Sequence, residues 1–134
     1  MSGNMENYTA SNTAIYLIQY HIIWTPKYRR CILVDELKNR LQQIIEEVCY
    51  ENALIVKALE IMPDHIHLFI GASPKMAPYK IVKALKGRTS HILREEFKEL
   101  LKMPTLWSGS YFISTIGNVS AKTIQQYIEK QWKK

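Results

Sequence analysis

Two histidines separated by a single residue, His65 and His67, are the side chains of this sequence best suited to bind a metal ion. The Pro63-Asp64 pair before them predicts a tight turn that leads directly into a strand. Successive side chains of a strand point to opposite faces, so both imidazoles share one face, about 6.6 Å apart along the strand. Two imidazoles at that spacing can bind one metal ion, although most strand histidines are structural and His-x-His alone is a weak signal. Alternation turns Asp64 away from the histidines, and its expected role is therefore in the turn.

A second pair of functional side chains lies near the far end of the chain. Tyr127 and Gln131 are four residues apart in a segment with helical character, so they lie on one face of the predicted helix. An isolated tyrosine most often packs its ring at a helix edge, and an isolated glutamine is usually solvated. Together with His65 and His67, however, they predict a site with two imidazoles and an amide oxygen as ligands, and a phenol beside the ion.

Composition sets the class of protein. The chain has 134 residues, of which 47% are hydrophobic, enough for one domain with a substantial core. Its 18 Lys and Arg against 12 Asp and Glu give a net charge of +6, which favours a polyanionic partner, nucleic acid before a membrane surface. Cys31 and Cys49 are far apart and are expected to be reduced thiols. No apolar run reaches the length of a membrane span and no signal peptide opens the chain, so we expect a cytoplasmic protein.

The pattern of apolar residues predicts how these side chains are positioned. Residues 1–12 are polar and are expected to form a flexible arm, and residues 13–134 a single domain. We expect strands over residues 15–24, 54–62, 65–70 and 106–116, and helices over residues 35–50, 78–101 and 121–132. Asp35 and Ser120 are the expected N-caps, and Gly87 is expected to bend or divide the second helix. The first six elements fit an α+β, ferredoxin-like (RRM-like) antiparallel sheet, to which a C-terminal helix carrying the tyrosine is added. In that fold the first and third strands are neighbours, which places Gln19 or His21 beside the histidine pair.

Two groups of basic residues are candidate DNA contacts. The first group can equally be solvated surface, and a lysine-rich helix face such as the second is usually solvated surface. The first interleaves an aromatic ring with cations, a combination that suits phosphate contact with base stacking; the second lies around Gly87 on the predicted helix. Their members are Lys27, Tyr28, Arg29 and Arg30 in the first group, and Lys83, Lys86 and Arg88 in the second.

Four segments together resemble a known family. They are residues 63–68, 86–90, 107–117 and 127–131, and in their order and content they are similar to the single-tyrosine HUH transposases of minimal prokaryotic insertion sequences. The resemblance extends from about residue 15 to residue 131. It implies a ferredoxin-like core, and a divalent metal ion held by His65, His67 and Gln131. It also implies that Tyr127 is the nucleophile that attacks single-stranded DNA, that DNA hairpins near the element ends are recognised, and that the protein is a homodimer. In such a dimer the tyrosine helix of one subunit can serve the histidine pair of the other.

The implied chemistry is consistent with the residue types. A phenol has a pKa of about 10 and is a weak nucleophile at neutral pH, but a nearby cation favours its ionised form and polarises the target phosphate. Attack would give a 5′-phosphotyrosine bond and a free 3′-OH that can later rejoin strands. Ester exchange needs no nucleotide cofactor, and the chain has no phosphate-binding loop motif. Imidazoles alone suit zinc, cobalt or nickel, whereas the resemblance favours Mg²⁺ or Mn²⁺.

Other functions fit the same pattern. A non-catalytic, single-stranded nucleic-acid-binding module of ferredoxin-like fold is the alternative from another class, although such modules carry aromatic residues where this third strand has histidines. A related HUH nicking enzyme of replication or conjugation, or a domesticated transposase acting on chromosomal repeats, would share the active site.

Overall fold

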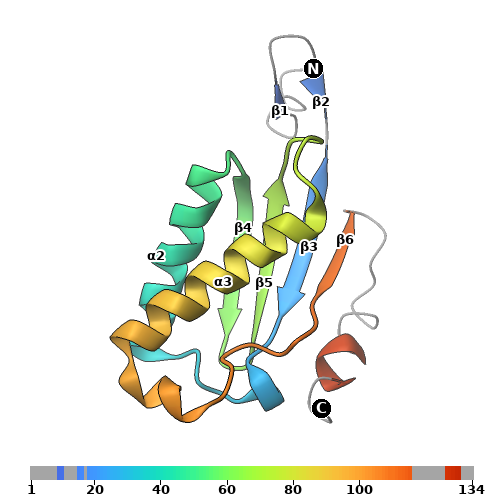
Figure 1. Ribbon diagram of the computed structural model, residues 1–134. Helices are drawn as coiled ribbons and strands as arrows, with labels where there is room; N and C mark the ends of the chain where they lie inside the picture. Colours follow the sequence, from blue (N-terminus) through green and yellow to red (C-terminus); the bar gives the residue numbers. More distant parts are fainter. Residues whose placement is uncertain (1–8, 11–14, 17, 116–125, 131–134) are drawn as a thin grey trace.

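The protein contains a four-stranded antiparallel sheet with two helices packed on one face (Figure 1). The structure is a computed structural model that describes residues 9–10, 15–16, 18–115 and 126–130. Its strands, in the order β4-β5-β3-β6 across the sheet, are β4 (Ile55–Met62), β5 (His65–Gly71), β3 (Gln19–Trp24) and β6 (Phe112–Thr115). The helices are α2 (Asp35–Glu51) and α3 (Pro78–Glu96), and the 3₁₀ segments are η1 (Lys27–Arg29) and η2 (Lys98–Lys102). The predicted α+β ferredoxin-like fold is confirmed, with β3 and β5 as central neighbours.

The core lies between the sheet and the two helices. The β5 side chains Ile66, Leu68 and Ile70 are fully buried, as the alternating pattern predicts. The apolar stripes of α2 and α3 pack against this row, and each fully buried Leu or Ile contributes about 1.5–3 kcal/mol. Because this row faces the helices, the alternate side chains of β5 are directed to the helix-free face of the sheet.

The structure corrects two predicted features of the helices. Asp35 is not the N-cap of α2; Val34 occupies that position without a side-chain cap, and Asp35 starts the helix at φ 55°. The segment that leads into α2 is held instead by a backbone hydrogen bond of 3.0 Å from Leu33 N to Pro63 O. Gly87 does not interrupt α3, which continues to Glu96 because apolar residues on both sides of the glycine pack on the core.

Two predicted strands are shorter than expected. The first is divided into β2 (Ile15–Tyr16), which pairs with β1 (Thr9–Ala10), and β3. The last is reduced to β6, and its expected beginning contributes only a bridge between Trp107 and Pro26. At the C-terminal end residues 126–130 are helical, and we call them the tyrosine helix. The predicted cap Ser120, the start of that helix and Gln131 lie outside the described residues.

Candidate active site

The histidine pair lies on the helix-free face of the sheet, on β5. The rings of His65 and His67 are half-buried, with centroids 4.9 Å apart and planes at 75°. Strand alternation thus brings the two imidazoles together, as the sequence predicts. Their spacing allows both rings to approach one ion.

His67 has a partner in the neighbouring strand. In the antiparallel register of β3 and β5, His21 lies opposite Phe69 and Ile23 opposite His67. His21 stacks on Phe69 at 4.5 Å between centroids, and its Nε2 lies 3.1 Å from Nδ1 of His67. The expectation that His21 lies beside the pair is thus confirmed by its contact with His67. Burial lowers the pKa of His21, and burial followed by the charges of the other histidines lowers the pKa of His67, so both favour the neutral form that a metal ligand requires.

His65 is held by a carboxylate. Asp64 Oδ1 lies 2.7 Å from His65 Nδ1, which overturns the expectation that Asp64 points away from the histidines. The side chain of a turn residue does not follow strand alternation, and here it folds back onto the next residue. The Nδ1 atoms of His65 and His67 are therefore both engaged, and the two Nε2 atoms remain as potential ligands.

This donor set fits a divalent metal ion. Ligating histidines usually hydrogen-bond through their second nitrogen to a carboxylate or another acceptor, as both imidazoles do here. Among the described residues, no group of three or more His, Cys, Asp or Glu could hold an ion. Gln131, the predicted amide ligand, lies outside the described residues.

Tyr127 packs on the same face of the sheet. Its ring lies 5.7 Å from that of Phe112, which faces Ile23 across the β3–β6 pair, and Ile23 in turn faces His67. Directly opposed residues share a face, so Phe112 and the histidines are on one side of the sheet. Burial raises the pKa of the Tyr127 phenol, an effect partly opposed by the nearby Ser110 side chain. The observed ring contact of Tyr127 is with Phe112 rather than with an imidazole.

Arg29 connects the two halves of the site. Its Nε lies 2.9 Å from Asp64 Oδ2, and its Nη1 donates a hydrogen bond of 3.3 Å to the carbonyl of Ile128 in the tyrosine helix. Sequence reasoning placed Arg29 among the DNA contacts, whereas the structure gives it protein partners. No local signal identifies such a role, because Arg29 and Ile128 are 99 residues apart in the chain.

The other members of the first basic group lie at the surface. Lys27 Nζ lies 5.4 Å from the centroid of the Tyr28 ring, and Tyr28 is 49% exposed. Arg30 is exposed as well. A cation beside an accessible aromatic ring is an arrangement that can bind a nucleotide by stacking and phosphate contact.

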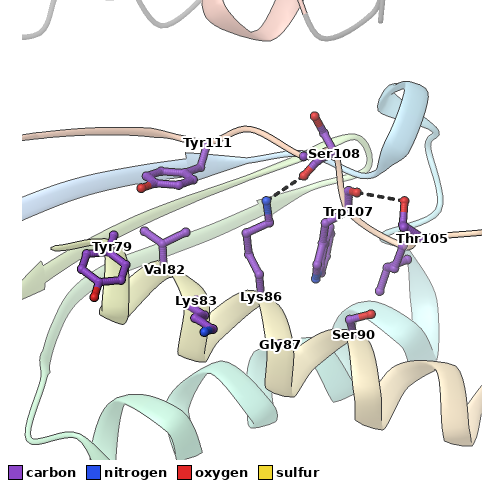
Figure 2. A pocket seen from close by; sticks show the side chains of 12 residues that line it. Tyr79, Val82, Lys83, Lys86, Gly87, Ser90, Thr105, Trp107, Ser108 and Tyr111 are labelled. Atoms are coloured by element: carbon purple, nitrogen blue, oxygen red, sulfur yellow. Dashed lines mark hydrogen bonds between the residues drawn. The ribbon is translucent and has the colours of Figure 1, made fainter. Parts of the chain in front are cut away.

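Lys83 and Lys86 of the second basic group border a groove between α3 and the loop before β6 (Figure 2). Tyr79 and Tyr111 lie at one end of this groove and Trp107 at the other, and its volume is about 480 Å³. None of the described residues that line it is acidic. Lys83 is exposed at its edge. The groove therefore combines aromatic rings with positive charge.

Lys86 and Arg88 have protein partners. Lys86 Nζ donates a hydrogen bond of 2.7 Å to the carbonyl of Ser108 (Figure 2). It donates a second, of 3.2 Å, to the carbonyl of Ser110, and burial lowers the pKa of Lys86. Arg88 forms an ion pair with Glu51 of α2. Of the three α3 residues predicted to contact DNA, Lys83 is exposed, Arg88 lies at the surface within an ion pair, and Lys86 is directed to backbone carbonyls.

Comparison with known proteins identifies the family. Residues 14–131 match the family of IS200-like transposases. The chain is 40% identical over 120 residues to the ISDra2 transposase TnpA of Deinococcus radiodurans, covering 87% of this chain and 86% of that protein. It is also 35% identical over 117 residues to the transposase for insertion sequence element IS200 of Salmonella typhimurium, covering 84% and 76% of the two chains.

Solved structures agree with the fold. A Deinococcus radiodurans R1 protein described as a transposase superposes with a TM-score of 0.85 at 38% identity, over 92% of this chain and 97% of that one. The REP-associated tyrosine transposase bound to a REP hairpin gives 0.59 at 14% identity, over 90% and 69%, and supports the fold alone. No helix in the described part of the chain is long and apolar enough to cross a membrane. The family match and the curated relatives together establish that this chain belongs to the IS200-like transposases.

Proposed function

We propose that this transposase cleaves and rejoins single-stranded DNA through a covalent bond between Tyr127 and a 5′ phosphate. The observation that carries the proposal is the placement of Tyr127 and the histidine pair on one face of the sheet, with Arg29 in contact with both the Asp64–His65 pair and the tyrosine helix. A nucleophile and a pair of potential metal ligands are the two parts that phosphoryl transfer to tyrosine requires.

In the cleavage step the Tyr127 hydroxyl oxygen attacks the phosphorus atom and the bond from phosphorus to the 3′ oxygen breaks. The products are a 5′-phosphotyrosine and a 3′-OH. Burial raises the pKa of Tyr127, so the neutral phenol predominates at pH 7. The phenol passes its proton to water as the new bond forms, and the leaving 3′ oxygen takes up a proton from water. In the joining step a 3′-OH attacks the phosphotyrosine and releases the tyrosine. One ester replaces another in each step, so no nucleotide cofactor is consumed.

His65 and His67 would hold the divalent ion, Mg²⁺ or Mn²⁺, with Gln131 as the third protein ligand. When bound, such an ion polarises the phosphate and stabilises the charge that develops on it. The chain itself contributes the orientation of the ligands: Asp64 holds the ring of His65 and His21 that of His67.

DNA binding is assigned to the exposed basic and aromatic residues. Lys27, Tyr28 and Arg30 are close in sequence to Arg29, and Lys83 borders the aromatic groove. We expect these residues to bind single-stranded DNA with hairpins near the element ends. The REP-associated neighbour, which is described as bound to a REP hairpin, motivates the hairpin part of this proposal.

The active form is proposed to be a homodimer. The contacts that seat the tyrosine helix lie within one chain in this structure, and the partner's helix could make the same contacts if the two helices were exchanged. Residues 116–125, which join β6 to that helix, lie outside the described residues.

The test is covalent capture of DNA. Protein is incubated with Mn²⁺ and labelled single-stranded DNA carrying an element end, and adducts that resist denaturation are separated on a gel. Tyr127→Phe should bind the DNA with wild-type affinity and form no adduct, because phenylalanine keeps the ring and lacks the hydroxyl. Tyr50→Phe, at an 87% exposed position on α2, is the matched control and should react like the wild type. An adduct with the Tyr127→Phe protein would assign the nucleophile to another residue. If the wild-type protein binds the DNA but forms no adduct, the result favours the non-catalytic alternative.

A further inference from the structure

Arg29 contacts two elements that are remote in sequence, each of which carries part of the candidate active site. Its Nε is 2.9 Å from Asp64 Oδ2 in the turn between β4 and β5. Its Nη1 donates to the Ile128 carbonyl, at 3.3 Å, in the residue directly after Tyr127. One guanidinium group thus contacts both the Asp64 carboxylate, which holds His65, and the backbone next to the proposed nucleophile.

The backbone around Arg29 adopts an unfavourable conformation. Tyr28 and Arg29 have φ values of 61° and 52°, in the left-handed region that residues other than glycine seldom occupy. Hydrogen bonds from Lys27 N to Leu106 O and from Arg29 N to Pro26 O, both 2.8 Å, hold this segment in place. Such strain persists only where the surroundings impose it, and it is concentrated at functional sites. Here it accompanies the placement of the Arg29 side chain between Asp64 and Ile128.

The contact with Asp64 continues to the histidine pair. Asp64 uses Oδ2 for Arg29 and Oδ1 for His65 Nδ1, at 2.9 and 2.7 Å. Since a carboxylate oxygen only accepts, the His65 proton belongs on Nδ1, and the lone pair of Nε2 is left for a ligand role. The orientation of His65 therefore depends on where Arg29 holds the carboxylate.

We propose that Arg29 is a positioning residue that fixes the tyrosine helix relative to the histidine pair. This inference rests on the proposed function, in which Tyr127 must reach a phosphate held at the histidines. The role requires the guanidinium fork, because its nitrogens can bind two acceptors in different directions, whereas a lysine ammonium has a single nitrogen. Arg29 acts on the geometry of the site and not on the affinity for DNA, in contrast to its neighbours Lys27 and Arg30.

Two variants distinguish the effect of the Arg29 side chain from the effect of its backbone conformation. Arg29→Lys keeps the positive charge and removes the fork. Arg29→Gly removes the side chain and tolerates the positive φ, so its effect cannot be ascribed to backbone strain. The matched control is Arg40→Lys, because Arg40 also joins two elements through a carboxylate. Its Nε, on α2, lies 2.8 Å from Oε1 of Glu96, on α3.

The first measurement separates DNA affinity from the rate of reaction. Fluorescence anisotropy gives the dissociation constant for single-stranded DNA, and single-turnover adduct formation at saturating DNA gives the rate. Misplacement by about 1 Å reduces rates on the order of 100-fold, so we expect both Arg29 variants to react about 10- to 100-fold more slowly with unchanged affinity. Guanidinium ion at millimolar concentration should restore part of the rate to Arg29→Gly and none to Arg29→Lys. Arg40→Lys should match the wild type.

The second measurement does not depend on catalysis. Hydrogen–deuterium exchange of the amides of residues 126–130, in protein without DNA or metal, reports how firmly the tyrosine helix is seated. Exchange should be faster in both Arg29 variants than in the wild type and Arg40→Lys. Weakened DNA binding with a wild-type rate at saturation would make Arg29 a DNA contact, and unchanged exchange together with an unchanged rate would also overturn the proposal. If wild-type protein forms no adduct, the proposed function fails, and the exchange comparison still decides whether Arg29 seats the helix.

Discussion

The Nε2 atom of His21 lies 3.1 Å from the Nδ1 atom of His67, across the pairing of β3 and β5. The contact leaves Nε2 of His67 as the nitrogen available to a metal ion. His21→Phe can keep the stacking on Phe69 but removes the hydrogen-bond partner. Loss of such a supporting contact lowers metal affinity by about 10- to 100-fold, and we expect a change of that size in a calorimetric Mn²⁺ titration. The control is His91→Phe at an exposed position of α3, and equal affinities of the two variants would contradict the role of His21.

The proposed metal ligands should differ in how much each contributes to cleavage. His65→Ala and His67→Ala are expected to abolish cleavage and leave hairpin affinity nearly unchanged, because the exposed basic residues lie elsewhere. Gln131→Ala should be milder, since it removes one neutral ligand and a raised Mn²⁺ concentration can compensate. Adduct formation and DNA affinity are measured on each variant over a range of Mn²⁺ concentrations. Cleavage at the full rate in the presence of a chelator would refute a metal-dependent mechanism.

Acid should destabilise the metal-free protein through the histidines. Burial lowers the pKa of His21 and His67 in the folded state below the ordinary value of 6.5, so the unfolded chain binds protons more readily. The stabilisation is complete above pH 6.5 and is lost as the pH falls through the lower, folded-state pKa values. We expect the thermal midpoint to decrease between about pH 7.5 and 5.5, and His21→Phe to reduce the decrease. A pH dependence identical in the variant would show that His21 does not contribute.

Lys83 and Lys86 should respond to substitution in different ways. Lys83 is exposed beside the groove, so Lys83→Gln should weaken DNA binding and reduce the slope of log affinity against log salt by about 1. Lys86 is bound to two carbonyls, and Lys86→Gln should lower the free energy of unfolding by about 1–3 kcal/mol. Denaturant titrations and salt-dependent anisotropy distinguish the two effects. Equal loss of DNA affinity with unchanged stability would place both lysines on the DNA.

Mixing two inactive variants tests the proposed dimer with exchanged helices. His65→Ala and Tyr127→Phe are each expected to be inactive alone. In a heterodimer with exchanged tyrosine helices, one site carries both defects and the other carries neither, so adduct formation should return to the mixture. If each helix serves its own chain, every site keeps one defect and the mixture remains inactive. An inactive mixture, in which heterodimers have been verified by mass spectrometry, would therefore exclude the exchanged arrangement.

Local patterns were sufficient to predict the sheet and the histidine pair. The alternation around Ile66 and Leu68 determines which face of β5 is buried, and the fold places His21 beside His67. The contacts of Asp64 and Arg29 could not be predicted in this way. They depend on a turn conformation, on positive φ values and on a partner 99 residues away, none of which leaves a periodic signal.

The same limit applies to the basic residues. The sequence groups Lys83, Lys86 and Arg88 as one lysine- and arginine-rich helix segment. In the structure one of them is exposed, one holds the loop before β6, and one forms an ion pair with Glu51. Formal charge is a property of the residue type, whereas availability to DNA depends on which carbonyls and carboxylates the fold brings within reach.

The long separation between Arg29 and the tyrosine helix has a consequence for protein synthesis. A chain translated only as far as Thr115 already contains all four strands of the sheet, both histidines and the basic residues, but not the nucleophile. Such a chain could occupy an element end without cutting it. A nonsense mutation between Thr115 and Tyr127 is therefore expected to yield an inhibitor of transposition that competes with the intact enzyme for its DNA, rather than a silent loss of function.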